Sequence, residues 1–359
     1  MSSANIRESL IAFGGIAQTN LATANMATDL LRVNKLNAAV NDFEATTEDD
    51  ALEIGKPSEF AQSHFVTSWG VRGTLEKYLS SEMASWLFAF GLGDSVVTVP
   101  AGGTLAHQHA ATVQDTAVEG LDMKAFSVLE QARPGSSYVI DRLYPGCVLE
   151  DFTMMVQSGA GRASSKFTAN YVGTGKVTTP SSYTMPSPLV EHLLPAASLA
   201  LSVNGVDYVS GGQIMEAEFT FKNNVRLDTG FYPGSGFQTT GDSTSGQIRG
   251  RMELGDRSIG VRFVARYAHG SAEYTKLLQG TEGSLAWNMT GALIEGTIKN
   301  SLSIAMGRIY FARVKNSNAN GIITVEVDAS ILLPADFSGV SGLVTATTIN
   351  QLAKVGSET

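Results

Sequence analysis

The residues whose side chains could do chemistry are few, and the most suggestive are two histidines. His107 and His109 flank Gln108, a spacing that would place both imidazoles on one face of a β-strand. Imidazole nitrogens bind zinc and other transition metals, but such a site needs further ligands. No acidic residue or third histidine lies close to this pair in the sequence. We therefore expect neither a metal site nor a cofactor.

An acidic run between residues 42 and 59 could suggest calcium binding. It contains seven carboxylates and a single lysine, Lys56. A calcium loop of the twelve-residue type requires Asp or Asn at alternate positions and a bidentate Glu at its end, and the run lacks both. The preferred interpretation is a loop that faces solvent or a partner.

Motifs for covalent catalysis and phosphate binding are also missing. Residues 70–73 (Gly-Val-Arg-Gly) and 234–236 (Gly-Ser-Gly) lack the strand-to-helix context and the lysine of a phosphate-binding loop. No serine lies in a Gly-x-Ser-x-Gly elbow. The single cysteine, Cys147, excludes an intramolecular disulfide and a cysteine metal cluster. We expect no enzyme; a hydrolase with dispersed paired carboxylates stays a minor alternative.

Composition indicates a globular chain with covered surfaces. The 359 residues are 43% hydrophobic and only 16% charged, with 37 glycines and a formal net charge of −9. This charge argues against tight binding to nucleic acid. A surface so poor in charge is typical of one that neighbouring subunits cover. No apolar run is long enough to span a membrane and no secretory signal is evident, so we expect synthesis and assembly in the cytoplasm.

The elements that must position these residues are predicted to be mainly β-strands. Alternation of apolar and polar residues, as in residues 216–222, is typical of half-buried strands. The strands are predicted at residues 31–40, 65–77, 96–99, 137–140, 148–156, 166–172, 214–225, 247–254, 284–289, 303–314 and 322–331.

Two segments with helical spacing interrupt this pattern. Residues 80–90 place Met83, Trp86 and Phe90 on one face, with Ser80 or Ser81 as N-cap and Gly91 as C-cap. Residues 259–267 place Ile259, Phe263 and Tyr267 on one face. Each is predicted to be one short helix packed on a sheet.

The same elements recur in the same order, which predicts an internal duplication. Each copy has a strand, a long loop, an aliphatic-Arg-Gly strand (Val71-Arg72-Gly73 and Ile248-Arg249-Gly250), a helix and a closing hairpin. An insertion at residues 102–132 distinguishes the first copy. The predicted organisation is an N-terminal arm at 1–27, a β domain at 28–179, a linker at 180–200, a second β domain at 201–333 and a C-terminal extension at 334–359.

This arrangement resembles the tail tube proteins of long-tailed bacteriophages (siphophages). The resemblance rests on the 31–33 strand, residues 71–75, residues 144–148 (Tyr-Pro-Gly-Cys-Val), residues 219–224 and residues 250–253, and extends over about residues 28–332. It implies two tandem β-sandwich or barrel domains whose sheets join laterally into rings. The rings stack into a tube, the channel for ejection of viral DNA, which passes without tight binding through a lumen lined by acidic and neutral groups.

The resemblance also implies where neighbouring rings touch. Loops 45–62 and 229–246 correspond to the family loop that reaches the adjacent ring. The candidate contact residues are Glu48, Asp49, Asp50, Glu53, Phe231 and Tyr232. The implied partners are further copies of the chain and other tail proteins, and the implied location is the virion tail after assembly in the host cytoplasm.

The sequence leaves alternatives open for the number of chains in a ring and for the function of the protein. If both copies build the wall, three chains make a ring of six repeats; if one copy decorates the outside, six chains are needed. We favour the trimer. A secretion-system tube protein would share the fold. A carbohydrate-binding β-sandwich would need exposed aromatic platforms, whereas Trp69, Trp86 and Trp287 lie in apolar patterns typical of a core.

Overall fold

The computed structural model describes most of the chain. It covers residues 9–33, 37–38, 42–49, 64–114, 123–132, 138–157, 164–204, 206–207, 214–233, 236–240, 243–266, 273–319, 321–332 and 342–356. These residues are mainly β-structure, as the alternating pattern predicts.

The strands and helices have the following bounds. The strands of the first half are β1 (Ser9–Gly14), β2 (Leu30–Val33), β3 (Asn37–Ala38), β4 (Asp42–Asp49), β5 (His64–Tyr78), β6 (Gly93–Thr98), β7 (His107–Val113), β8 (Phe126–Ala132), β9 (Ile140–Gln157) and β10 (Ser164–Gly173). Those of the second half are β11 (Ala200–Val203), β12 (Val206–Asp207), β13 (Ile214–Lys222), β14 (Phe237–Thr240), β15 (Ser243–Gln247), β16 (Ser258–Arg266), β17 (Gly283–Glu295), β18 (Ile298–Ala319), β19 (Ile322–Ile331) and β20 (Val344–Asn350). The α-helices are α1 (Ser81–Leu92) and α2 (Glu273–Gln279).

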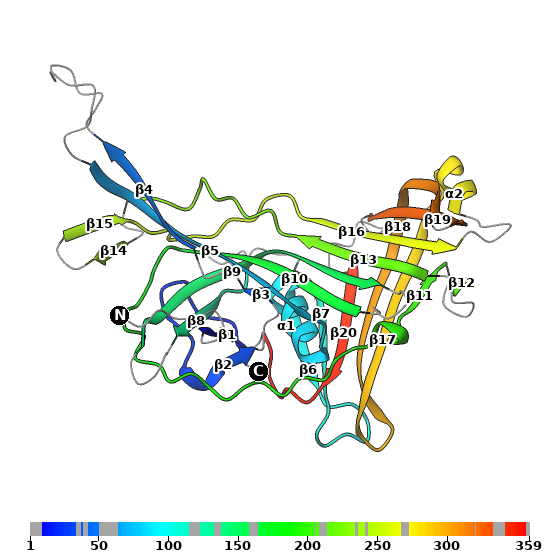
Figure 1. Ribbon diagram of the computed structural model, residues 1–359, viewed down its shortest axis with the longest axis horizontal. Helices are drawn as coiled ribbons and strands as arrows, with labels where there is room; N and C mark the ends of the chain where they lie inside the picture. Colours follow the sequence, from blue (N-terminus) through cyan, green and yellow to red (C-terminus); the bar gives the residue numbers. More distant parts are fainter. Residues whose placement is uncertain are drawn as a thin grey trace.

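Eight strands form one antiparallel sheet across the molecule. Their order is β4, β5, β10, β9, β13, β16, β19 and β18, and β3 lies beside β5 on the same edge as β4. Figure 1 shows this sheet running along the length of the molecule, with β4 and β5 at one end and β19 and β18 at the other. We call it the main sheet.

Two long strands connect the main sheet to further strands. The first part of β18 pairs with β17 and β20, and β20 continues to β7 and β6, while β11 pairs with β17. The first part of β9 pairs with β8, which leads to β1 and β2. A bulge lies within each long strand, where local twist increases and redirects the chain.

Helix α1 lies inside the fold between these layers. All twelve of its residues are buried. The Ser80 hydroxyl accepts a hydrogen bond from Met83 N, which confirms the predicted N-cap. The predicted C-cap at Gly91 is wrong, because the helix continues to Leu92 and Gly93 adopts the positive φ of 98° that ends it. Gly91 instead allows close packing, since a Cβ there would lie 2.8 Å from Phe152.

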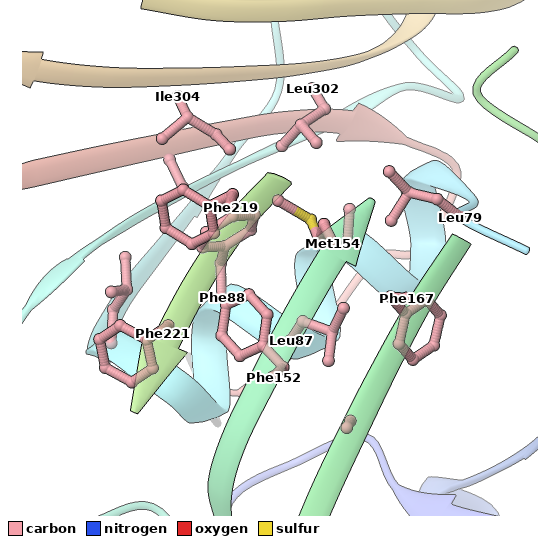
Figure 2. Packing of buried hydrophobic residues seen from close by; sticks show 14 of the residues in the cluster. Leu79, Leu87, Phe88, Phe152, Met154, Phe167, Phe219, Phe221, Leu302 and Ile304 are labelled. Atoms are coloured by element: carbon pink, nitrogen blue, oxygen red, sulfur yellow. The ribbon is translucent and has the colours of Figure 1, made fainter. Parts of the chain in front are cut away.

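Aromatic rings from both halves of the sequence fill the space between α1 and the main sheet (Figure 2). Phe88 of α1 packs edge-on against Phe152 of β9 and at a tilt against Phe219 of β13, with ring centroids 5.4 and 5.7 Å apart. Phe152 also stacks on Phe221 at 5.5 Å. These contacts are part of one buried cluster that extends from Ile11 to Val355.

The segment predicted as a linker packs against the fold. Glu191 forms an ion pair with the buried Lys77, and burial lowers the pKa of this lysine against the opposing effect of Glu191. Glu82, in the first turn of α1, accepts hydrogen bonds from His192 N and lies 2.7 Å from His192 Nδ1. Backbone bonds also join Leu189 to Arg32 and Leu194 to Leu79. The division into two domains stays a prediction.

The predicted helix at residues 259–267 is wrong, because residues 258–266 form strand β16. Ile259, Val261, Phe263 and Ala265 are all buried, so the apolar period is two. A spacing of four residues fits both a helix and alternate positions of a strand, which explains the error. The helix of the second half is α2, which follows β16.

Other boundaries also differ from the prediction. Residues 248–254 are not a strand, because their backbone groups bond to other loops: Arg249 N donates to Thr174 O and Gly250 N to Gly230 O. The predicted match of Ile248-Arg249-Gly250 with Val71-Arg72-Gly73 is therefore wrong, since only residues 71–73 lie in a strand, β5. The predicted loop 45–62 begins within strand β4, and the predicted loop 229–246 contains strand β14 and most of β15. The described residues of the predicted strand 31–40 form β2 and β3. The predicted strands 137–140 and 148–156 are replaced by the single strand β9, which begins at Ile140. The insertion at 102–132 contributes β7 and β8.

Replacing Phe88 by alanine tests the shared core. Loss of the ring leaves a cavity between α1, β9 and β13, so Phe88→Ala should lower the free energy of unfolding by about 3–5 kcal/mol. Denaturant titration measures this change. The exposed Thr290 of β17 provides the control, since Thr290→Ala should change stability by less than about 0.5 kcal/mol. A loss below about 1 kcal/mol for Phe88→Ala would contradict the buried position of the helix.

Candidate functional site

The two faces of the main sheet differ in chemistry. One face carries the buried residues that pack on α1, such as Leu75, Phe167 and Phe219. The residues between them line up across strands on the other face, for example Glu76, Thr168, Thr153, Thr220 and Gly260 in one row. We call this second face the polar face.

Basic and acidic residues are nearly equal in number on the polar face. The basic residues are Arg72, Lys166, Lys222, Arg262, Arg266, Arg313 and Lys315. The acidic residues are Glu44, Glu76, Asp151, Glu216, Glu218, Glu326 and Asp328.

Arg262 lies at the centre of a carboxylate cluster on this face. Its Nε donates to Glu326 Oε1 at 2.9 Å and its Nη1 to Glu216 Oε1 at 3.0 Å. Carboxylate oxygens of Glu218 and Asp328 lie 3.8 and 4.0 Å away. The hydrogen bond from Arg262 lowers the pKa of Glu326, and the same bond raises the pKa of Arg262. The guanidinium charge is therefore neutralised within the chain.

Arg313 extends the cluster to the last strand of the sheet. Its Nε donates to Asp328 at 2.6 Å and its Nη2 to Glu326 at 3.0 Å. The side chain of Arg313 is nevertheless 55% exposed. It can therefore take a further partner on the open side of β18.

The main sheet ends in two strand edges. Residues 310–319 of β18 pair with β19 on one side, and β4 pairs with β5 on one side. Within the part of the chain that the structure describes, no strand pairs with the other side of either segment. Unpaired N–H and C=O groups along a strand are a template for pairing with another chain. These two free edges are the candidate sites of lateral assembly.

Of the predicted inter-ring residues that the structure describes, Glu48 and Asp49 lie in a hairpin arm, and Phe231 and Tyr232 precede a second hairpin. Glu48 and Asp49 pair through their backbone with Phe65 and His64 in the β4–β5 hairpin. Asp50 and Glu53 lie outside the described residues. Figure 1 shows this hairpin extending from one end of the molecule, with β14 and β15 at the same end.

The second pair of predicted contact residues lies near the other hairpin. The Arg249 guanidinium lies over the Phe231 ring at 4.7 Å, and it donates to Leu227 O and Gly173 O. The Phe231 side chain is therefore partly buried by a contact within the chain. Tyr232 is 47% exposed and remains available to a neighbour.

The residues considered for metal binding have structural surroundings. His109 is buried, and its Nε2 lies 2.9 Å from Leu352 O and 3.1 Å from Asn350 Oδ1. Burial lowers the pKa of His109 to about 4, so the ring is neutral at pH 7. Among the described residues, no three His, Cys, Asp or Glu side chains are grouped to hold a metal. Cys147 is buried, and burial raises the pKa of its thiol well above the ordinary value.

Comparison with known protein families gives a match over nearly the whole chain. The model of the phage tail tube protein family matches residues 12–339. The chain therefore belongs to the phage tail tube protein family, and its role is a structural one in the phage tail. No curated protein was found to match it. In the described residues, none of the helices is both long and apolar enough to cross a membrane.

Sequence reasoning missed the carboxylate cluster, although its signal was present. Glu216 and Glu218 alternate with buried residues along β13, and Arg262 does so along β16. The opposite charges are consistent with a cross-strand pair, but only the register of β13 with β16 places Glu218 opposite Arg262. Misassignment of residues 259–267 as a helix concealed this relation.

Replacing Arg262 by methionine tests the cluster. Because Arg262 is partly exposed, Arg262→Met should lower the free energy of unfolding at pH 7 by only about 1 kcal/mol. The pKa of Glu326 is lowered by the folded cluster, so the contribution of Arg262 is present above the ordinary Glu value of 4.5 and declines as the pH falls below it. Denaturant titrations from pH 7 to pH 3 should therefore show the difference from wild type shrinking in acid.

Arg266 provides the matched control on the same strand. Arg266→Met removes the same charge from an exposed position at the end of β16 and should change stability by less than about 0.5 kcal/mol. Equal losses for the two variants, or a loss for Arg262→Met that does not vary with pH, would refute the role assigned to the cluster.

Proposed function

We propose that this chain is the ring subunit of the tail tube, and that its polar face lines the channel through which viral DNA is ejected. One observation carries the proposal: the main sheet has a core on one face, polar side chains on the other, and a free edge at each end. A sheet of this kind is completed by copies of itself. Closure into a barrel removes both free edges.

Barrel geometry favours three chains in each ring. Each chain supplies the eight strands of the main sheet, so three chains supply twenty-four. With a strand spacing of ~4.8 Å and a tilt of about 40°, such a barrel has a backbone radius of roughly 25 Å. This leaves an opening wider than a DNA duplex after inward side chains are allowed for. Six chains that each contribute the whole sheet would double the radius.

The charges of the polar face favour passage of DNA over capture. The net charge alone predicts an acidic lining, but this face also carries many basic groups. Arg262 and Arg313 are paired with carboxylates about 3 Å away and Lys166 Nζ lies 3.7 Å from Glu76, so the positive charge of these three groups is offset within the chain. Binding of DNA along its backbone depends on unpaired Lys and Arg that displace counterions. A lining of internally paired charges holds DNA weakly and lets it slide.

The two hairpin arms are the proposed contacts between stacked rings. The β4–β5 hairpin contains Glu48 and Asp49, and the β14–β15 hairpin follows Phe231 and Tyr232. Gln247 of β15 pairs in parallel with Ser68 of β5, so the arms lie beside each other. Both can therefore reach the same neighbouring ring. Stacking of this head-to-tail kind does not close on itself and yields a filament.

The proposed partners are other copies of the chain, other tail proteins and the DNA in transit. The proposed setting is assembly in the host cytoplasm followed by incorporation into the virion tail, without enzymatic activity. A carbohydrate-binding role finds no support from the tryptophans, because Trp86 and Trp287 are buried in the core and Trp69, although outside the core, is only partly exposed. Large stacking platforms for sugars must be exposed.

Negative-stain electron microscopy of the purified chain tests the proposal. The chain should form rings or stacked tubes with a central channel, because closure satisfies the free edges. Particles that remain monomeric and globular at all concentrations, with the chain shown to be folded, would overturn the proposed function.

Removal of the first arm tests the stacking role. Deletion of residues 48–57 should leave the core folded, because it removes only the last two of the pairs that join β4 to β5, and it should shorten or abolish tubes. A variant with these ten residues replaced by a Gly/Ser segment of equal length controls for loop closure. Long tubes formed by both variants at normal concentration would refute the assignment.

A further inference from the structure

The two halves of the chain contribute strands to the main sheet in the same order. The first half supplies β4, β5, β10 and β9, and the second supplies β13, β16, β19 and β18. In each set the last two strands along the chain form a hairpin, β9–β10 and β18–β19. The internal junction of the sheet is therefore the pairing of the hairpin strand β9 with the leading strand β13.

A bulge in each hairpin aligns the two sets residue by residue. In β9 the extra residue lies between Leu149 and Asp151, and in β18 it lies between Phe311 and Arg313. Asp151 therefore corresponds to Arg313. Two residues further along the strands, Thr153 corresponds to Lys315.

The alignment continues across the middle strands. Asp151 pairs with Asn170 and Asn170 with Thr74, whereas Arg313 pairs with Asp328 and Asp328 with Arg262. Thr74 of β5 therefore corresponds to Arg262 of β16. Gly70 lies four residues before Thr74, and Ser258 lies four residues before Arg262, so Gly70 corresponds to Ser258.

The leading strands complete the correspondence. Gly70 pairs with Glu44 of β4, and Ser258 pairs with Lys222 of β13, so Glu44 corresponds to Lys222. Position 42 pairs with Arg72, which corresponds to Gly260, and Gly260 pairs with Thr220. Position 42 therefore corresponds to Thr220. In the internal junction Lys222 lies opposite Asp151 and Thr220 lies opposite Thr153.

We propose that β18 of one chain pairs antiparallel with β4 of a second copy in the register of the internal junction, which sets Arg313 opposite Glu44 and Lys315 opposite Asp42. This inference rests on the proposed function and specifies its lateral contact. The internal junction has an acid on the hairpin strand and a base on the leading strand. In the junction between chains the two charges are exchanged: the base, Arg313, is on the hairpin strand and the acid, Glu44, is on the leading strand.

The charges of the two free edges fit this pairing and oppose the others. Strand β4 has four carboxylates and no basic residue, whereas residues 310–319 of β18 have two basic residues and no carboxylate. Opposite charges directly across strands stabilise a pair, and like charges destabilise it. Pairing of β4 with β4 or of β18 with β18 is therefore disfavoured. The contact is directional, as closure of a ring requires.

Cysteine cross-linking tests the register. The variant Glu44→Cys/Arg313→Cys should form a disulfide between neighbouring chains in mild oxidant, because directly opposite residues have Cβ atoms ~5 Å apart. Denaturing gel electrophoresis without reductant should show covalent multimers. The native Cys147 is buried and does not compete. The variant Asp42→Cys/Lys315→Cys tests the same register where the first pair impairs assembly.

Two controls calibrate the result. Asp151→Cys/Lys222→Cys occupies the internal junction and should give a disulfide within one chain. Glu44→Cys/Ser317→Cys shifts the register by four residues, or about 13 Å, and should give no multimers.

The outcomes separate this inference from the proposed function. Multimers from the 44/313 or 42/315 pair, with none from the shifted pair, support the register. Tubes from wild type, together with an internal disulfide at 151/222 but no multimers from either in-register pair, would overturn the register and leave the proposed function intact. Failure of wild type to form any ring or tube would overturn both.

Discussion

The antiparallel pairing of β9 with β13 joins the two halves of the chain, and the rest of the structure depends on it. This pairing places Phe152 beside Phe221 on one face, where the rings stack over helix α1, and Asp151 opposite Lys222 on the other. The apolar side of the junction closes a single core. The polar side of the junction joins the polar surfaces of the two halves. This one interface between the two halves therefore contributes both to the stability of the chain and to the surface that it presents.

The same pairing of β9 with β13 leaves the main sheet with a strand edge at each end. In the proposed duplication, a repeat that pairs through a hairpin strand on one side and a leading strand on the other needs a neighbour at each edge, and one chain of two such repeats satisfies only the internal junction. The proposed duplication thus accounts for the free edges at β4 and β18. Free edges normally promote aggregation, and charged residues limit it. In the proposed ring, charges of opposite sign on the two edges direct the association of β18 with β4 of a neighbouring copy.

The sequence predicted the elements whose signals were local. Alternation located long strands such as β5, β10 and β19 but missed others such as β7, β8 and β20, and Ser80 correctly marked the start of α1. The errors arose where a tertiary contact decides the structure. Residues 259–267 have a spacing that fits strand or helix, and only pairing of β16 with β13 and β19 settles it. The carboxylate cluster around Arg262 and the docking of Glu191 on Lys77 join residues far apart in sequence, so no local pattern could show them.

A symmetry-resolved reconstruction of the assembled tube tests the central claim, that both repeats build the wall and that three chains close each ring. The account predicts three-fold symmetry with approximate six-fold repetition, in which three Asp151–Lys222 junctions within chains alternate with three Arg313–Glu44 junctions between chains. Imposing six-fold averaging should then blur the side chains at every junction. Six chains in each ring, or six-fold averaging without loss of side-chain detail, would contradict the account.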